Sequence, residues 1–245
     1  MNCIGIIPAR YASTRFEGKV LATLLGKPLI QHVWEQAKKS KLLDDLIIAC
    51  DDERIEEKAK EFGAKVMLTS RDHISGTDRL TEIVQPLDVK VVVNIQGDEP
   101  LVHFTMIDDV ARTLLENPDC VMATVIKPIS NLKEVKDPNV VKVVVDRNGF
   151  ALYFSRSQIP YPRDNEATAG YYKHIGLYSY TKDFLFTFKN LPESSLEKTE
   201  RLEQLRVLDA GFKIKTVQTE FDTVGVDTPE DLKKVEAILL KAKHD

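Results

Sequence analysis

The first half of the chain alternates between short apolar runs and segments with helical periodicity. Continuous apolar runs bounded by polar loops are typical of strands that are buried on both faces of a parallel sheet. Apolar residues that recur every three or four positions predict amphipathic helices between those strands. The predicted strands are 3–8, 46–50, 65–68, 90–95 and 120–126, and the predicted helices are 28–37, 52–62, 76–84 and 104–115. This order predicts an α/β fold with a mostly parallel sheet and helices on both of its faces.

The pattern changes after residue 126. Apolar segments on both sides of the turn Arg147-Asn148-Gly149 predict a β-hairpin. We therefore expect an inserted antiparallel lobe at about 127–182, within a single domain of residues 1–245. The elements predicted here and beyond are strands at 140–145, 151–154 and 175–180, a helix at 200–210 and a strand at 213–217.

The composition indicates a globular protein whose main partner is neither nucleic acid nor membrane. Lys and Arg number 34 and Asp and Glu 38, a formal net charge of −4, whereas proteins that bind a phosphate backbone usually carry a basic excess. No apolar run approaches the roughly 20 residues that span a bilayer, and no secretory signal pattern is present. The three cysteines lack CxxC spacing, which is typical of reduced, buried thiols. These features predict a cytoplasmic protein.

A cationic loop follows the first predicted strand. Arg10, Arg15 and Lys19 lie close together there, at the strand end where open α/β sheets bind their ligands. Arginine can bind phosphate oxygens with two hydrogen bonds and lysine adds a compact charge, so the loop predicts a polyphosphate site. The alternative is a solvated basic loop. The loop matches neither GxxxxGK[ST] nor GxGxxG, which disfavours an ATPase or a dehydrogenase.

Two carboxylates from distant segments are candidates for a magnesium site. Asp98 follows the most convincing of the predicted buried strands, 90–95, and Mg²⁺ commonly takes one or two carboxylates together with waters and substrate phosphates. The alternative for Asp98 is an ordinary turn residue or helix cap. Asp227 precedes a helix for which Thr228 is the predicted N-cap, Pro229 the first helical residue and Asp231 the reciprocal cap. The alternative is that Asp227 is itself the cap.

Three further clusters give weaker signals. A helix N-terminus can bind a phosphate or read a base edge, although its polar residues are also ordinary caps. Two side chains four positions apart on a strand share a face, and charged residues on an amphipathic helix are usually solvated. The clusters are Ser75, Gly76 and Arg79 at a helix start, His174 and Tyr178 on a strand, and Glu203 and Gln204 on a helix.

In this order, these segments closely resemble the 3-deoxy-manno-octulosonate cytidylyltransferases, or CMP-Kdo synthetases. The matching segments are PARYASTRFEGK, HISGTDR, NIQGDEP, NVVKVVVD, ALYFSR, HIGLYSY, LEQLRVL and GVDTPEDL, from Ile6 to about Leu232. The resemblance implies a nucleotide-binding fold of the glycosyltransferase-A type and a homodimer. It also implies a magnesium-dependent reaction of CTP with Kdo to give CMP-Kdo and pyrophosphate, which activates Kdo for lipopolysaccharide synthesis.

The resemblance also implies roles for individual residues. Lys19, Arg15, Asp98 and Asp227 would be catalytic, and the two aspartates would bind magnesium. The nucleotide would lie against Pro8, Ala9, Arg10, Arg15, Lys19, Ser75, Gly76, Arg79 and Asp98. The sugar would face Gln96, His174, Tyr178, Glu203 and Gln204, with Arg156 as a further candidate.

The mechanism expected from these residues is an in-line attack of the sugar's anomeric hydroxyl on the α-phosphorus of CTP, without a covalent intermediate. The protein must bring two anions together and neutralise the charge on the transferred group. The alternatives are a cytidylyltransferase for another acceptor, such as a sialic acid, and a nucleotide-binding regulator without catalytic activity. A glycosyltransferase is disfavoured because no DxD-type metal motif is present.

Overall fold

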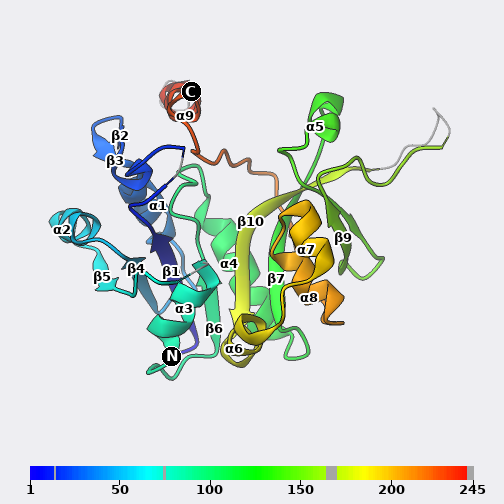
Figure 1. The fold of residues 1–245 in the computed structure, drawn as a ribbon, viewed down its shortest axis with the longest axis horizontal. Helices are drawn as coiled ribbons and strands as arrows, with labels where there is room; N and C mark the ends of the chain where they lie inside the picture. The colour runs from blue at the N-terminus through cyan, green and yellow to red at the C-terminus, as the bar shows by residue number, and fades with distance from the viewer. Residues whose placement is uncertain (14, 74–75, 164–169, 242–245) are drawn as a thin grey trace.

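Residues 1–13, 15–73, 76–163 and 170–241 are described by the computed structural model. Its main sheet contains β1 (Cys3–Ala9), β4 (Asp45–Cys50), β5 (Lys65–Leu68), β6 (Val91–Asn94), β7 (Met122–Pro128), β8 (Lys142–Val145), β9 (Ala151–Ser155), β10 (Tyr172–Thr181) and β11 (Lys215–Gln218). The strands run in the order β11-β7-β10-β6-β1-β4-β5 (Figure 1). Neighbours on this path are parallel except where β10 pairs with β6 and β7. The predicted mostly parallel sheet is confirmed.

Helices cover both faces of the sheet, as the sequence pattern predicts. On one face lie α1 (Leu29–Ala37), α2 (Glu53–Glu61) and α4 (Phe104–Glu116), and on the other α3 (Gly76–Val84), α6 (Lys182–Asn190) and α8 (Gln204–Asp209). Successive residues of β6 pack into the hydrophobic cores on opposite faces of the sheet. Val91 and Val93 pack on the first face and Val92 packs on the second. This explains why β6 is a continuous apolar run rather than an alternating one.

The predicted antiparallel region is partly a hairpin and partly the middle of the main sheet. β8 and β9 form the predicted hairpin, and Gly149 supplies the positive φ of its turn. The short helix α5 (Leu132–Lys136) precedes them. β10 then returns into the main sheet between β6 and β7, with Tyr178 opposite Asn94. A β-bulge between Ile175 and Tyr178 interrupts the pairing of β10 with β7.

The helix predicted at 200–210 is wrong as a single element. The structure has α7 (Ser195–Glu200), a break, and then α8. Arg201 adopts a left-handed conformation with φ 54°, which ends α7. Arg206 joins the two helices by a bidentate ion pair with Glu197, with N–O distances of 2.7 and 2.6 Å. The break places Glu203 and Gln204 at the start of α8, where they face the sheet.

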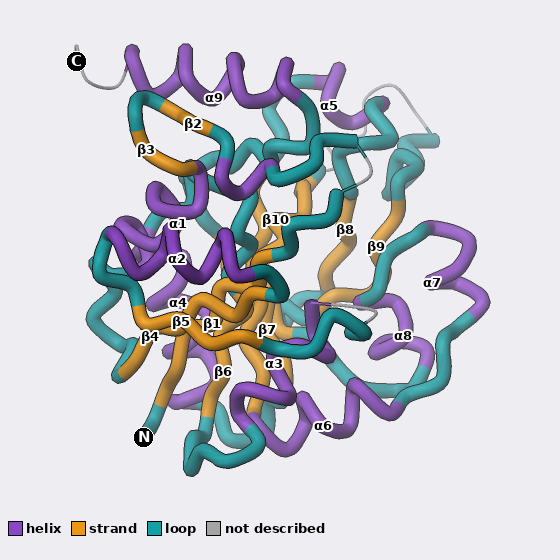
Figure 2. The backbone as a smooth tube through the Cα atoms, turned by 60° about the vertical axis from the view of Figure 1, so that its left-hand side comes forward, coloured by secondary structure: helices purple, strands orange, loops and turns teal. Residues whose placement is uncertain are grey.

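The last helix follows the predicted capping pattern. α9 (Pro229–Lys241) begins at the predicted proline. Asp231 N donates to Thr228 Oγ1 over 3.2 Å, and Thr228 N donates to Asp231 Oδ2 over 3.1 Å. α9 covers β2 (Thr23–Leu24) and β3 (Lys27–Pro28) through a small apolar cluster that includes Leu24, Val226 and Val235 (Figure 2). Pro28 is the N-cap of α1 rather than its first helical residue.

The three cysteines are buried and unpaired, as predicted. Burial, together with nearby carboxylates, raises the pKa of the Cys3 thiol to about 12. Burial also raises the pKa of the Cys50 thiol to about 11, although a backbone hydrogen bond opposes part of this rise. Both thiols therefore stay protonated at neutral pH and behave as small apolar groups. Among the described residues, no helix is both long enough and apolar enough to cross a bilayer.

Candidate active site

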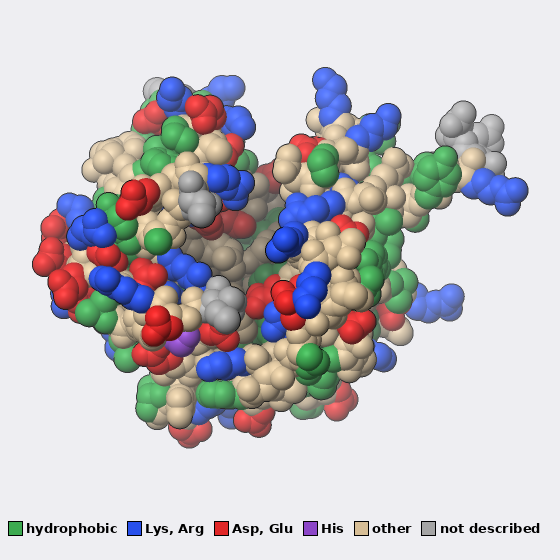
Figure 3. Space-filling model, viewed as in Figure 1, with side chains coloured by type: hydrophobic (Ala, Val, Ile, Leu, Met, Phe, Trp, Pro, Cys, Tyr) green, Lys and Arg blue, Asp and Glu red, His purple; other side chains and the backbone are tan. Residues whose placement is uncertain are grey.

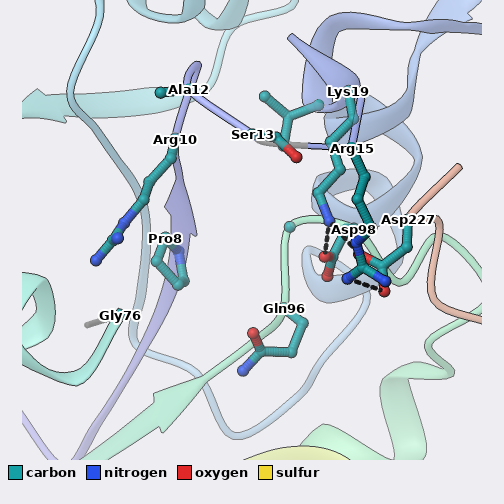
Figure 4. Close-up of a pocket in the computed structure, with 12 residues that line it drawn as sticks. Pro8, Arg10, Ala12, Ser13, Arg15, Lys19, Gly76, Gln96, Asp98 and Asp227 are labelled. Carbon is teal, nitrogen blue, oxygen red and sulfur yellow. Dashed lines mark hydrogen bonds and ion pairs between the residues drawn. The ribbon is translucent and has the colours of Figure 1, made fainter. Parts of the chain in front are cut away.

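A cavity of about 410 Å³ opens at the carboxyl ends of β1 and β6. In the space-filling view a hollow lies near the centre of the molecule, with Lys and Arg side chains around it (Figure 3). We call this space the outer cavity. Its lining residues are Pro8, Arg10, Ala12, Ser13, Arg15, Lys19, Val20, Gly76, Gln96, Gly97, Asp98 and Asp227 (Figure 4). The structure thus brings the cationic loop and both predicted metal ligands to one place.

The cationic loop is held in a defined shape. Gly18, with φ 65°, donates its N–H to Tyr11 O over 2.9 Å, and Lys19 then begins the 3-10 turn η1 (Lys19–Leu21). Tyr11 N donates to Asp51 Oδ1 over 3.1 Å, and the Arg54 guanidinium lies 3.3 Å from the centre of the Tyr11 ring. These contacts fix both ends of the loop before any ligand binds, which lowers the ordering cost of binding.

One cation of the loop, Arg10, has a guanidinium nitrogen that is available for a ligand. Its Nη2 is buried, and in the described part of the chain it has no hydrogen-bond partner. Buried guanidinium nitrogens are normally paired, because desolvating a charge without a partner is unfavourable. Arg10 also lines the outer cavity. Its side chain is therefore ready to bind an anion that enters there.

Asp98 and Asp227 meet although they lie 129 positions apart in the sequence. Val226 N donates to Asp98 O over 2.9 Å, which joins the two segments through the backbone. The Val226 side chain is fully buried between α1 and α9. Because Thr228 and Asp231 cap α9, the carboxylate of Asp227 is free to face the cavity.

Lys19 bridges the two carboxylates. Its Nζ lies 2.5 Å from Asp98 Oδ2 and 2.9 Å from Asp227 Oδ1, and Arg15 Nη2 lies 2.9 Å from Asp227 Oδ2 (Figure 4). Burial lowers the pKa of Lys19, but the two carboxylates outweigh it and the net shift is upward. Lys19 is therefore a permanent cation at neutral pH. The predicted convergence of the two aspartates is confirmed.

The same two carboxylates fit a divalent cation with few protein ligands. Within the described ranges, no group of three or more His, Cys, Asp or Glu side chains forms a complete metal cage. Two carboxylates that share a cavity with cations are the donor set that Mg²⁺ uses when substrate phosphates and waters complete its coordination. The residues present therefore suit a metal that arrives with a phosphate ligand better than a structural ion.

Gly97 allows the second loop to approach the first. A Cβ at this position would lie 2.8 Å from Pro8 O, so no other residue fits without moving the backbone. The close approach places Gln96 and Asp98 on either side of the end of β1. Gln96 consequently lines both the outer cavity and a second, smaller one.

The smaller space, which we call the inner cavity, has a volume of about 100 Å³. It lies on the α3 and α6 face of the sheet and shares Gly76 and Gln96 with the outer cavity. Its lining residues are Gly76, Thr77, Asn94, Gln96, Met122, Tyr178, Tyr180, Phe188, Glu203 and Gln204. Four of the five residues predicted to face the sugar, namely Gln96, Tyr178, Glu203 and Gln204, line this cavity.

Glu203 is oriented within the inner cavity by a neighbouring helix. Thr77 Oγ1 donates to Glu203 Oε2 over 3.1 Å. Burial raises the pKa of Glu203, and the Thr77 hydrogen bond and Arg206 oppose part of that rise. The interpretation of Glu203 and Gln204 as part of a solvated helix face is therefore wrong, and Gln204 is only 4% exposed.

Two predicted nucleotide-binding residues that the structure describes, Arg79 and Ala9, do not line either cavity. Arg79 is completely buried, with Nη2 3.1 Å from Asp51 Oδ2 and Nη1 hydrogen-bonded to Thr69. Because Asp51 also accepts from Tyr11 N, Arg79 supports the cationic loop from behind rather than lining the cavity. Ala9 is buried within β1. Ser75, also predicted to bind the nucleotide, lies outside the described residues.

His174 lies beside the inner cavity rather than on it. Its Nε2 is 3.0 Å from Thr124 Oγ1, and it lines a separate cavity of about 280 Å³ together with Glu99 and Lys173. Thr124 also donates to Leu177 O over 2.9 Å and so holds the bulge of β10. Burial lowers the pKa of His174 to about 3, so the ring is neutral at neutral pH. The structure thus places His174 under the bulge of β10, next to the cavity that the other four residues predicted to face the sugar line.

The buried neutral ring of His174 predicts an acid sensitivity of folding. The pKa is about 3 in the folded state and about 6.5 when unfolded, so the unfolded chain gains a proton as the pH falls below about 6.5. Stability should therefore decrease from about pH 6.5 downward, by about 2 kcal/mol between pH 6.5 and 5 from this residue alone. Urea unfolding at both pH values should show a smaller loss for His174→Gln. An equal loss in both proteins would contradict the assignment.

Arg156, the further sugar-binding candidate, is used within the protein. Its N and Nε bind Glu200, with N to Oε2 at 2.9 Å and Nε to the carbonyl oxygen at 2.7 Å. Nη1 donates to Pro138 O over 3.0 Å. These contacts join β9 to the end of α7, and Arg156 lines neither cavity.

The sequence patterns did not single out Thr77 and Asn94, which line the inner cavity. Thr77 is 3% exposed and Asn94 5% exposed. The available signal for Asn94 was a polar residue at the end of an otherwise apolar buried strand. Such a residue costs stability unless its polar atoms are satisfied, so its presence in a strand core indicates a specific partner.

The fold and the two joined cavities define a nucleotidyltransferase. Residues 4–214 match the cytidylyltransferase family model. The chain is 51% identical over 95% of its length, and 92% of the relative's, to a 3-deoxy-manno-octulosonate cytidylyltransferase of Solibacter usitatus. It is 50% identical to one from Syntrophotalea carbinolica, with 98% of this chain and 99% of that one covered.

Solved structures agree with this result. A CMP:2-keto-3-deoxy-manno-octonic acid synthetase complexed with CTP superposes with a TM-score of 0.94 at 42% identity, over 99% of this chain and 100% of the other. A glucose-1-phosphate thymidylyltransferase-like protein from Bacillus anthracis has a TM-score of 0.68 at 17% identity, covering 96% of this chain and 94% of its own, and so shares the fold. The chain belongs to the 3-deoxy-manno-octulosonate cytidylyltransferase family.

Proposed function

We propose that this protein transfers CMP from CTP to Kdo, giving CMP-Kdo and pyrophosphate, with Mg²⁺ as cofactor. The observation that carries the proposal is the meeting of Lys19, Asp98 and Asp227 in a cavity that joins a second, hydroxyl-lined one. The family relationship supports the same substrates. We further propose a cytoplasmic homodimer that supplies activated Kdo for lipopolysaccharide synthesis.

The outer cavity suits the triphosphate. Arg10 has an unpaired buried nitrogen there, and Arg15 and Lys19 add two charges that only carboxylates now neutralise. A polyphosphate would offer each of them stronger, charge-assisted hydrogen bonds. The anomeric hydroxyl of the sugar would enter from the inner cavity, across Gln96 and Gly76, which line both spaces. The two reactants would then meet beside Asp98.

In the reaction, the chain's residues would position charge rather than form covalent bonds. Asp98 and Asp227 would hold Mg²⁺, whose chemistry is the neutralisation of phosphate oxygens and a lowered pKa for the attacking hydroxyl. Lys19 and Arg15, displaced from the aspartates, would stabilise the charge that develops on the transferred group and on pyrophosphate. The O–P bond to the sugar forms as the bond to pyrophosphate breaks, and the hydroxyl proton passes to solvent.

A direct assay tests the proposed function. The purified protein is incubated with CTP, Mg²⁺ and a panel of sugar acids that includes Kdo and sialic acid, and pyrophosphate release is measured. We expect rapid release with Kdo and loss of release when a chelator removes the metal. Release with sialic acid alone would identify another cytidylyltransferase. CTP binding by calorimetry without pyrophosphate release for any acceptor would indicate a nucleotide-binding regulator.

Oligomeric state is tested independently. Sedimentation equilibrium of the full chain should give about twice the monomer mass if the proposed homodimer forms. A monomer mass over the concentration range of the assay would contradict that part of the proposal and leave the activity untouched.

A further inference from the structure

The inner cavity contains two buried polar atoms of opposite character that lack partners. Asn94 Oδ1 is an acceptor and Gln204 Nε2 is a donor, and neither has a hydrogen-bond partner within the described ranges. The two side chains are 5% and 4% exposed, and both line the same space of about 100 Å³. Buried polar atoms without partners are rare in native proteins and indicate a missing ligand or water.

Asn94 lies at the end of a central strand, on the face of the sheet that holds the inner cavity. Asn94 ends β6 and lies directly opposite Tyr178 on β10, so both side chains are on the face that α3 and α6 cover. Burial raises the pKa of Tyr180, and a hydrogen bond from Asn94 partly opposes that rise. Of the polar atoms of the Asn94 amide, Oδ1 is the one that is buried without a partner within the described ranges.

The chemistry of the lining selects hydroxyl groups. Among the described residues that line the inner cavity, Glu203 is the only formal charge, and no Lys or Arg is present. A carboxylate of the acceptor would meet repulsion from Glu203 here and attraction from Arg10, Arg15 and Lys19 in the outer cavity. A hydroxyl both donates and accepts, so hydroxyl groups are suitable partners for Asn94 Oδ1 and for Gln204 Nε2.

We propose that Asn94 is a specificity-determining residue that accepts a hydrogen bond from one hydroxyl group of the sugar acceptor in the inner cavity. This inference rests on the proposed function and adds a residue to it. Through this contact the inner cavity would recognise the hydroxyl group at one position of the sugar. A site whose buried polar groups are left unpaired by the wrong substrate discriminates strongly against it.

The test compares monodeoxy analogues of Kdo in the wild-type protein and in Asn94→Val. Valine has a similar size and favours strands, so β6 should remain folded; Asn94→Ser is the second variant. For the wild-type protein, one deoxy analogue should lose roughly 10- to 100-fold in kcat/KM relative to Kdo. In Asn94→Val the kcat/KM for Kdo should fall by a similar factor, and the preference for Kdo over that analogue should shrink to within about threefold.

A matched control lies on the same strand pair. Ser179 is completely buried on the opposite face of β10, where its Oγ donates to Val110 O over 2.7 Å. Ser179→Ala removes a buried hydrogen bond from this strand pair without touching the inner cavity, and it should keep the wild-type preference. Melting temperature and the KM for CTP confirm that each variant is folded and binds nucleotide.

The outcomes separate this inference from the proposed function. A folded Asn94 variant that keeps the wild-type preference for every analogue would show that water alone satisfies the amide, and would overturn the inference. So would a wild-type protein that treats every deoxy analogue as it treats Kdo. Failure of the wild-type protein to release pyrophosphate with any acceptor would instead refute the proposed function.

Discussion

Asp98→Asn should reduce kcat by at least about 1,000-fold with magnesium saturating, equivalent to roughly 4 kcal/mol of transition-state stabilisation. Asn keeps the shape of the side chain and loses its charge. The carboxylate of Asp98 is 2.5 Å from Lys19 Nζ and shares that cation with Asp227. Removing it would leave one carboxylate for the proposed metal site. Steady-state kinetics over a range of Mg²⁺ concentrations measures the effect.

The loss should be catalytic rather than structural. Asp98 is 30% exposed at its side chain, and its backbone oxygen, not its carboxylate, holds Val226. The melting temperature of Asp98→Asn should therefore stay close to that of the wild-type protein. Asp109→Asn is a suitable control, since Asp109 pairs with Arg112 on the exposed face of α4 and lines neither cavity. Near-normal turnover for Asp98→Asn would remove Asp98 from the proposed chemistry.

Much of this site could be predicted because its signals are local. The cations of the first loop, the apolar strand before Asp98, and the capping pair Thr228 and Asp231 are each encoded within a few residues. The capping pair is the most informative of these signals. Because Thr228 and Asp231 cap α9, the side chain of Asp227 is not needed as the helix cap. That two such local features meet was a prediction about the fold, and the backbone bond from Val226 to Asp98 now explains how they do.

The rest depends on burial and pairing between distant segments, which local patterns do not contain. Arginine and histidine are common in binding sites, but the side chains of Arg79 and His174 form hydrogen bonds inside the protein. Arg79 binds Asp51, and His174 binds Thr124. The helix predicted at 200–210 is interrupted at Arg201, which adopts a left-handed conformation. Glycine is the usual sequence signal for that conformation, and position 201 is an arginine. Asn94 shows the reverse case. It is a polar residue in an apolar strand, and the sequence does not indicate its partner. The inner cavity that Asn94 lines is formed with residues of β10 and α8, which are distant in the sequence.

Lys19→Met should change metal binding and catalysis in opposite directions. In the free protein the Lys19 ammonium lies between the two carboxylates that would bind Mg²⁺, so it competes with the ion. Without the ammonium, these like charges face each other and attract a divalent cation more strongly. We expect metal affinity in the absence of nucleotide to rise by about tenfold. Calorimetry or Mn²⁺ paramagnetic resonance measures this change directly.

Catalysis should nevertheless fall, because Lys19 has a second duty once the triphosphate is bound. Losing a charge that stabilises the transferred group should lower kcat/KM for CTP by about 100- to 1,000-fold. Lys27→Met is the matched control: Lys27 is a half-exposed lysine that pairs with Glu35 at 2.8 Å and lines neither cavity, so its replacement should alter neither property. Metal affinity that is unchanged or weaker in Lys19→Met would show that the ammonium does not hold the metal position. A rise in metal affinity together with a fall in kcat/KM would establish two roles for Lys19: it neutralises the aspartates in the free protein and binds the phosphates during turnover.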